Sequence, residues 1–323
     1  MNATQSLMDD LKQKVSTLPK RVIFPEQSDR RVIEAIKTLQ AQSLCEPVLL
    51  SPSDELEVEV LTHREDADYW YEQALRSLTD RSGKHRLKVD EAREALKEPL
   101  LLASVLLRVG YVDAGVAGSL ATTADVLRAA IKGVGLAVGT QLVSSTFLME
   151  WPDKVFTFGD CAVNPRPNAQ QLAQIAIDSA ASHFALTGEK PKVGLLSFST
   201  NGSAQHEDVT TVRQALALVR EQAPDLDVDG ELQFDAALLP TVAAKKAPGS
   251  PVAGDCNVFI FPNLGAGNIA YKITERLAGA NAIGPVLQGT AKPWLDLSRG
   301  CSTEDIVNTA VIGSLLAHQQ VGV

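Results

Sequence analysis

Short runs of Val, Ile, Leu and Phe recur along the chain between longer segments whose apolar residues follow the spacing of a helix. Each short run has the length of a buried strand and is too short for a core helix. The predicted strands are residues 21–25, 47–50, 112–118, 192–198, 257–261 and 282–288. The predicted helices include residues 31–42, 168–186, 205–222, 268–278 and 303–319. This alternation predicts an α/β fold with mainly parallel sheets covered by helices.

Five polar or glycine-rich turns beside these runs are candidates for ligand contact. In α/β folds, ligands gather where loops leave the carboxyl ends of the strands. The five turns are residues 25–31, 118–128, 199–204, 262–268 and 297–302.

The chain length predicts the number of domains, and the net charge excludes some classes of partner. A chain of 323 residues is longer than one hydrophobic core usually organises, which predicts two domains. A net charge of −9 gives no global positive field, so nucleic acid and anionic membranes are not expected partners. An anionic ligand would therefore need a local pocket.

Cysteine and histidine spacing gives no sign of a metal site or a disulfide framework. The four cysteines form no C-x-x-C pair and the five histidines no H-x-x-x-H pair. Residues 1–21 mix acids and bases, and no uncharged apolar run approaches the roughly 18 residues of a membrane span. We expect a cytoplasmic protein with reduced thiols and no bound metal.

Two familiar ligand motifs are matched only in part. Asp225, Asp227, Asp229 and Gly230 follow the spacing of a calcium loop, but position twelve is Ala236, so the bidentate glutamate is missing. An acidic turn leading into a short strand explains the segment better.

The second partial motif is the G-x-G-x-x-A sequence at 265–270, which has the loose form of a dinucleotide fingerprint. The carboxylate expected about 20 residues later is absent, because residues 288–289 are Gln and Gly. What remains is a glycine loop in which Asn268 and Lys272, near a helix start, could contact an anion or a carbonyl group.

Two hydroxyls, Thr122 and Thr123, stand before a predicted helix that carries Arg128. One threonine could simply cap the helix, since a hydroxyl there accepts from a free backbone N–H. The same N–H groups, the hydroxyls and the arginine would also suit a phosphate. The residues alone leave both interpretations open.

The sequence Ser298-Arg299-Gly300 lies just before the last predicted helix. Ser302 and Asp305 fit an acidic capping box at that helix start. The capping box does not explain Arg299, because a cation beside a helix N-terminus faces the positive end of the macrodipole. We infer that an anion binds between them.

Several of these segments together resemble the phosphate acetyltransferases, also called phosphotransacetylases. The resemblance runs in order from "RVIFPEQSDRRVIEA" to the C-terminal helix, in the short form of the family. It is carried most clearly by residues 122–128, 229–237, 249–254, 258–272 and 284–307.

The resemblance implies that the enzyme interconverts acetyl phosphate plus coenzyme A with acetyl-CoA plus phosphate, with coenzyme A a substrate and no cofactor. It implies two α/β/α domains with the active-site cleft between them, generally in a homodimer. Residues 1–138 plus 288–323 would form the first domain, and 139–287 the second.

By the same resemblance, Ser298, Arg299 and Asp305 match the family's active-site serine, arginine and aspartate. Arginine suits bidentate binding of a phosphoryl group, and a serine hydroxyl can donate to the developing oxyanion. Asp305 is the candidate base for the thiol. No histidine or lysine adjoins Ser298, and Cys301 fits a packing residue, so we expect direct transfer in a ternary complex.

Arg128 matches a family arginine implicated in substrate binding. The second such arginine aligns best with Arg81, while Arg76 and Arg86 remain possible because this region carries extra residues.

Three other functions stay open on the sequence. A phosphate butyryltransferase would use the same chemistry on a longer acyl chain. A metal- and NAD-dependent decarboxylating dehydrogenase has a similar architecture and would need a divalent cation. A catalytically silent acyl-phosphate or coenzyme A sensor would bind ligands without forming a thioester.

Overall fold

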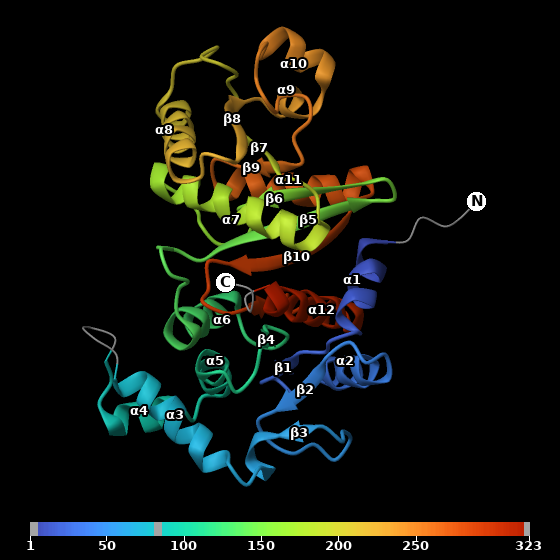
Figure 1. Ribbon diagram of the computed structural model, residues 1–323, viewed down its shortest axis with the longest axis vertical. Coiled ribbons are helices and arrows are strands. Elements are labelled where there is room, and N and C mark those ends of the chain that lie inside the picture. The colour runs from blue at the N-terminus through green and yellow to red at the C-terminus, as the bar shows by residue number, and fades with distance from the viewer. Residues whose placement is uncertain (1–5, 81–85, 320–323) are drawn as a thin grey trace. The chain divides into compact units, whose positions relative to one another are not determined.

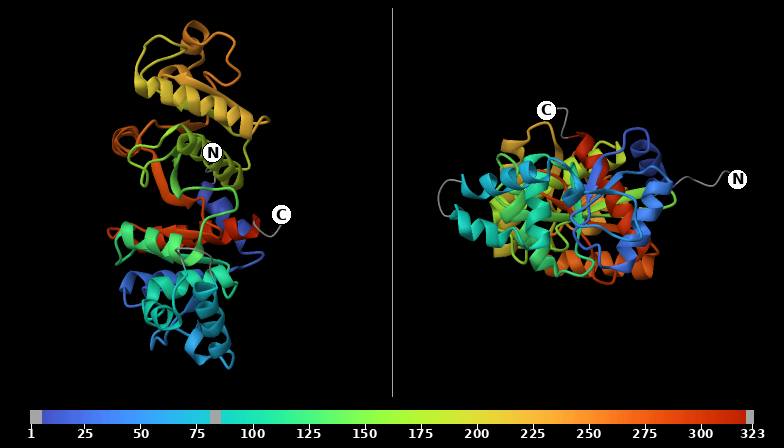
Figure 2. Two further views of the ribbon diagram at one scale, coloured as in Figure 1. Left: turned by 90° about the vertical axis from the view of Figure 1, so that its left-hand side faces the viewer. Right: turned by 90° about the horizontal axis from the view of Figure 1, so that it is seen from below.

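A computed structural model describes residues 6–80 and 86–319 and divides them into two compact units. The first unit comprises Ser6–Gly139 and the segment from Thr290 onward, and the second comprises Thr140–Gly289. Each unit is a β-sheet flanked by helices (Figures 1 and 2). Among the described residues, no helix is both long and apolar enough to cross a membrane.

The first unit contains a five-stranded sheet in which every pair of neighbours is parallel. In sheet order the strands are β11 (Trp294–Asp296), β4 (Ala114–Ala117), β1 (Arg21–Ile23), β2 (Glu46–Leu49) and β3 (Glu59–Val60). The helices of this unit are α1 (Leu7–Val15), α2 (Arg30–Ala41), η1 (Leu61–His63), α3 (Ala67–Thr79), α4 (Val89–Ala95), α5 (Pro99–Val109), α6 (Thr123–Ala129), the π-helical turn η3 (Ala130–Val134) and α12 (Thr303–Gln319).

Strand β11 is buried on both faces, and its side chains alternate between two helices. The Trp294 indole N–H donates to the Val126 carbonyl of α6 at 3.2 Å. Leu295 points to the opposite face, where a Cβ on Gly313 of α12 would lie 3.1 Å from it. With this period of two, Asp296 returns to the α6 side of the sheet.

The second unit contains a six-stranded mixed sheet. Its strands, in sheet order, are β10 (Asn281–Gln288), β5 (Ser144–Trp151), β6 (Lys154–Gly159), β9 (Val258–Ile260), β7 (Lys192–Leu196) and β8 (Asp227–Leu232). The four strands from β6 to β8 are parallel, whereas β5 is antiparallel to both of its neighbours. The predicted α/β class with mainly parallel sheets is confirmed, but the β5–β6 hairpin was not predicted.

Helices cover both faces of this second sheet. Val258 and Ile260 of β9 pack in one hydrophobic cluster with residues of α7 (Ala169–Thr187) and α8 (Glu207–Gln222). Phe259, which points the other way, packs in a second cluster with residues of α11 (Leu264–Ala278). Helices α9 (Phe234–Leu238) and α10 (Pro240–Lys246) complete the unit.

The glycine motif at 265–270 is helical, so the predicted glycine loop is wrong. Asn263 caps α11 by accepting from the Ala266 N–H at 3.0 Å, and the helix begins four residues earlier than predicted. A Cβ on Gly267 would lie 2.5 Å from the Asp160 carbonyl oxygen. The glycine therefore permits close packing of α11 against that loop.

Candidate active site

Ser298 and Arg299 form an exposed tight turn directly after β11. The Ser298 carbonyl accepts from the Cys301 N–H at 2.9 Å, and the Ser298 hydroxyl oxygen accepts from the Gly300 N–H at 3.2 Å. The hydroxyl proton is not used in this turn. Ser298 can therefore donate to a ligand.

The capping box predicted at the start of α12 is confirmed. The Ser302 hydroxyl accepts from the Asp305 N–H at 3.1 Å, and Asp305 Oδ2 accepts from the Ser302 N–H at 2.8 Å. Asp305 is exposed, and its Oδ1 has no hydrogen bond within the described part of the chain. One carboxylate oxygen thus caps the helix while the other remains available.

Arg299 has no carboxylate partner among residues 6–80 and 86–319, although most arginines with ion pairs in this unit have one within 3.2 Å. Its side chain is exposed beside the N-terminus of α12. A guanidinium near the positive end of a helix dipole gains nothing from it unless an anion is added. The anion site at Arg299 stays a prediction.

Arg31, near the start of α2, ties the Ser298–Arg299 turn to two other loops. Its Nη1 donates to the carbonyls of Arg299 at 2.9 Å and Cys301 at 2.6 Å. Its Nη2 donates to the Ser119 carbonyl at 2.9 Å and to Asp29 Oδ2 at 2.7 Å. One side chain thereby holds together the loops that follow β1, β4 and β11.

Glu26 fills the backbone N–H nest in the loop that follows β4. Its Oε2 accepts from the N–H groups of Gly118 at 2.6 Å and Ser119 at 2.8 Å, and from the Ser119 hydroxyl at 3.2 Å. Its Oε1 accepts from the N–H groups of Leu120 at 3.0 Å and Ala121 at 2.6 Å. This internal carboxylate occupies the nest that could otherwise bind a phosphate.

Asp296, the last residue of β11, is only 2 % exposed. Its Oδ1 has no hydrogen-bond partner in the described structure. Burial raises the pKa of Asp296 to about 7, the Thr123 hydroxyl lowers it by hydrogen bonding, and the charge of Glu26 raises it further. A buried ionisable carboxyl therefore lies two residues before Ser298.

Thr122 is the N-cap of α6, as one of the two interpretations predicted. Its hydroxyl oxygen accepts from the Asp125 N–H at 3.2 Å, and its hydroxyl donates to Asp125 Oδ2 at 2.6 Å. Arg128 forms an ion pair with Asp125 and remains largely exposed. These contacts leave the Arg128 guanidinium able to bind a further anion.

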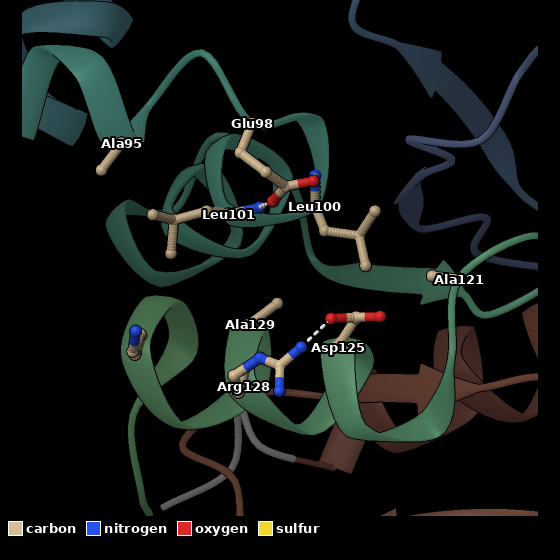
Figure 3. Close-up of a pocket in the computed structure, with 9 residues that line it drawn as sticks. Ala95, Glu98, Leu100, Leu101, Ala121, Asp125, Arg128 and Ala129 are labelled. Atoms are coloured by element: carbon tan, nitrogen blue, oxygen red, sulfur yellow. Dashed lines mark hydrogen bonds and ion pairs between the residues drawn. The ribbon is translucent and has the colours of Figure 1, made fainter.

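A cavity of ≈ 440 Å³ lies beside Arg128 in the first unit. Figure 3 shows Leu100 and Leu101 on one side of it and Asp125 and Arg128 on the other. Lys132 also lines the cavity and adds a second cation. Glu98 and Asp125 line it too, so its apolar walls carry two cations and two carboxylates. The exposed Arg128 and Lys132 suit the phosphates of a ligand that also has an apolar body.

The remaining predicted contacts lie elsewhere in the chain. Asn268 and Lys272 are on α11 in the second unit, where Asn268 Nδ2 donates to the Cys161 carbonyl at 3.0 Å and Lys272 is exposed. Arg81 lies outside the described residues. Its alternatives, Arg76 at the end of α3 and Arg86, are both exposed.

Sequence reasoning missed three residues that shape this site: Glu26, Arg31 and Asp296. The turn at 25–31 was noted as a candidate for ligand contact, but nothing in one sequence tells which loop its charges will reach. Asp296 gave a weak signal, because a carboxylate seldom ends a strand that is otherwise apolar and fully buried.

The four cysteines are buried and unpaired. Burial raises the pKa of the Cys301 thiol, the Arg31 charge lowers it, and Asp305 raises it. A buried thiol with a raised pKa fits the packing role expected for Cys301.

Comparison with known proteins gives the family. The family model for phosphate acetyl/butaryl transferases matches residues 6–314. A phosphate acetyltransferase from Thermoanaerobacterium thermosaccharolyticum is 41% identical over 97% of this chain and 100% of its own length. A phosphotransacetylase structure from Staphylococcus aureus superposes with a TM-score of 0.87 at 39% identity and covers 96% of this chain and 98% of its own. One from Streptococcus pyogenes superposes with a TM-score of 0.89 at 36% identity and covers 97% of this chain and 98% of its own. The chain therefore belongs to the phosphate acetyl/butaryl transferase family.

Proposed function

We propose that this enzyme is a phosphate acetyltransferase, which interconverts acetyl-CoA plus phosphate with coenzyme A plus acetyl phosphate by direct transfer in a ternary complex. Family membership supports the reaction class. The proposed site rests on the exposed Arg299, which has no ion-pair partner within residues 6–80 and 86–319 and lies on a turn held by Arg31.

Arg299 and Ser298 act on the acetyl phosphate. The guanidinium binds phosphoryl oxygens in a bidentate manner and neutralises charge that grows on phosphate as the acetyl C–O bond breaks. The Ser298 hydroxyl donates to the carbonyl oxygen as it becomes an oxyanion. Because the Gly300 N–H already fixes the Ser298 oxygen, the hydroxyl needs little reorientation to do so.

Asp305 accepts the proton of the coenzyme A thiol. A thiol has a pKa of about 8.5 and is mostly protonated at neutral pH, so attack by sulfur benefits from a base. Asp305 Oδ1 carries no hydrogen bond from any described residue, while Oδ2 is fixed by the Ser302 N–H. The carboxylate can hold the helix end and face the thiol together.

Coenzyme A binds along α6. Arg128, together with Lys132, provides cations for its phosphates, and the apolar walls of the adjoining cavity cover its less polar parts. Arg128 lies five positions after Thr123, so the two residues are about 7.5 Å apart along the helix axis. Thr122, Thr123, Asn268, Lys272 and Arg81 stay predicted substrate contacts.

Two alternatives are separable by experiment. The acyl chain preference distinguishes an acetyltransferase from a butyryltransferase, which the family description also includes. Relatives at about 40% identity favour the transferase over the dehydrogenase.

We also propose that the enzyme works in the cytoplasm as a homodimer. Its unpaired, buried cysteines suit a reducing compartment. Helix α11 exposes Ile269, Ile273 and Leu277, which are 60%, 52% and 83% exposed. Their spacing of four puts them on one face, as expected for a surface that a second copy covers.

The reaction is tested by mixing purified protein with acetyl phosphate and coenzyme A, without added metal, and following thioester absorbance. We expect acetyl-CoA to form at the same rate with and without EDTA, and faster from acetyl phosphate than from butyryl phosphate. Loss of activity in EDTA together with thermal protection by NAD would indicate the dehydrogenase. Ligand binding without thioester formation would indicate the sensor.

Arg299→Ala should lower turnover by about 10²-fold or more, because a transition-state charge contact is lost. Arg299→Lys should rescue little of this, since lysine cannot bind two oxygens in one plane. Arg93→Ala is the matched control, as Arg93 is exposed on α4 with only a 3.9 Å contact to Glu72. Near-normal turnover of Arg299→Ala would reject the proposed role.

Asp305→Asn separates the base from the helix cap. Asparagine can still accept from the Ser302 N–H, so the melting temperature should change by only a few degrees while turnover falls by about 10²-fold. Normal turnover per folded molecule with a clearly lower melting temperature would leave Asp305 as a cap alone.

Leu277→Glu should convert a dimer into a monomer, because it places a charge in the apolar face of α11. Light scattering coupled to size-exclusion chromatography measures the mass. The control is Leu18→Glu, which changes another exposed leucine in the first unit. A dimer that survives Leu277→Glu unchanged would assign the interface to another surface.

A further inference from the structure

Asp296 and Glu26 are two buried carboxyls that contact the same residue, Gly118. The Gly118 N–H donates to Glu26 Oε2 at 2.6 Å. A Cβ on Gly118 would lie 2.6 Å from Asp296 Oδ1, and the residue has a φ of +109°, where only glycine is readily accommodated. No side chain can separate the two carboxyls at this point.

The hydrogen-bond donors around the pair are divided unequally. Four backbone N–H groups and one hydroxyl point at Glu26, which is the environment of a carboxylate ion. Asp296 has the Thr123 hydroxyl as a partner, and its Oδ1 has none. Two like charges in one buried site are unfavourable, so the neutral member of the pair should be Asp296.

Among the described residues, no cation is a cause of the shifted Asp296 pKa. Strand β4, its neighbour in the sheet, carries no ionisable side chain. The charged or titratable groups on the other elements packed around β11 and its turn are Glu26, Asp29, Arg31, Asp125, Arg128, Arg299, Cys301, Glu304, Asp305 and His318. Of the cations in this set, Arg31 pairs with Asp29 and Arg128 with Asp125, whereas Arg299 has no carboxylate partner among the described residues. Only Glu26 acts appreciably on Asp296, and it repels charge.

We propose that Asp296 holds a proton while the enzyme works, and that this neutral carboxyl beneath the Ser298–Arg299 turn allows the turn to receive a phosphate dianion. The inference rests on the proposed function. Loss of the proton adds a negative charge two residues from Ser298 and next to Glu26. The added charge repels Glu26 and disturbs the 118–121 loop that Glu26 holds and that Arg31 ties to the turn, and phosphate binding at the turn weakens as a result. Asp296 is thus a positioning residue and does not react.

The pH dependence has a definite sign. With a pKa raised from 3.8 to about 7, the folded protein keeps the Asp296 proton that the unfolded chain loses. Stability therefore falls as pH rises from about 4 to about 7, and the loss is complete above that range. Asp296→Asn, a neutral mimic of the protonated acid, should lack this component of the pH dependence.

The test compares kcat/KM for acetyl phosphate in wild type and Asp296→Asn from about pH 5.5 to about pH 8.5, where the ratio cancels ionisations that both proteins share. The ratio is kcat/KM of Asp296→Asn divided by that of wild type. We expect this ratio to be constant below pH 6 and to rise by about tenfold by pH 8, one unit above the Asp296 pKa of about 7. A ratio that stays constant across the range overturns the proposal. So does a folded Asp296→Asn that is inactive at every pH, since an ionised carboxylate would then be required.

Asp178→Asn is the matched control. Burial raises the pKa of Asp178, on α7, to about 6, against a lowering by its hydrogen bond with Gln174. This variant should alter the pH dependence of unfolding and leave the pH profile of kcat/KM unchanged. If Asp178→Asn changed the kinetic pH profile as Asp296→Asn does, any buried carboxyl with a raised pKa would produce the effect. That result also contradicts the proposal.

Infrared spectroscopy gives a readout that needs no activity and no folded Asp296→Asn. In the Asp178→Asn background, a carboxylic-acid C=O band should be present at pH 6 and disappear as the pH rises through 7. Its absence at pH 6 overturns the proposal. If wild type forms no thioester at any pH but the band is present, the proposed function fails while the protonation of Asp296 stands.

Discussion

The geometry of the Ser298–Arg299 turn in the first unit depends on one arrangement, in which Glu26 and Arg31 bind three loops at the carboxyl edge of the sheet. Glu26 satisfies the N–H groups of residues 118–121 after β4, and Arg31 satisfies carbonyls after β4 and β11. Both side chains come from the loop and helix start that follow β1. The backbone polar groups of these turns are thereby paired inside the protein, and the exposed Ser298 and Arg299 side chains remain free for a ligand.

The alternation of strand β11 links this edge to the fold beneath it. Trp294 and Asp296 face α6, and Leu295 faces α12. The strand therefore fixes the two helices whose N-termini carry Thr123 and Asp305. A buried strand thus sets the position of Ser298 and Arg299, which lie two and three residues beyond its end. The packing of Trp294 and Leu295 therefore positions the polar side chains at the end of the strand.

Sequence patterns predicted the α/β class, strands β1, β2, β4, β7 and β9, and the starts of α2, α7, α8 and α12 to within two residues, because buried strands and capped helices have local signatures. The Ser302–Asp305 capping box is an example: its two hydrogen bonds join residues three apart. Strands β3, β6 and β11 were not predicted, and α11 begins four residues before its predicted start. The antiparallel β5–β6 hairpin was missed, since its pairing is a tertiary property. The glycine at 267 was misjudged because it permits close contact with Asp160, about a hundred residues earlier in the chain. Glu26, Arg31 and Asp296 were missed for the same cause: their partners lie in other loops.

We propose that the phosphoryl group binds at Arg299, a guanidinium just before a helix N-terminus that has no carboxylate partner in the described part of the chain. A crystal structure of the protein soaked in acetyl phosphate or sulfate tests this. We expect an anion held in a bidentate manner by Arg299 and contacted by Ser298. An Arg299 side chain that points into bulk solvent, with the anion bound at another place, would contradict it.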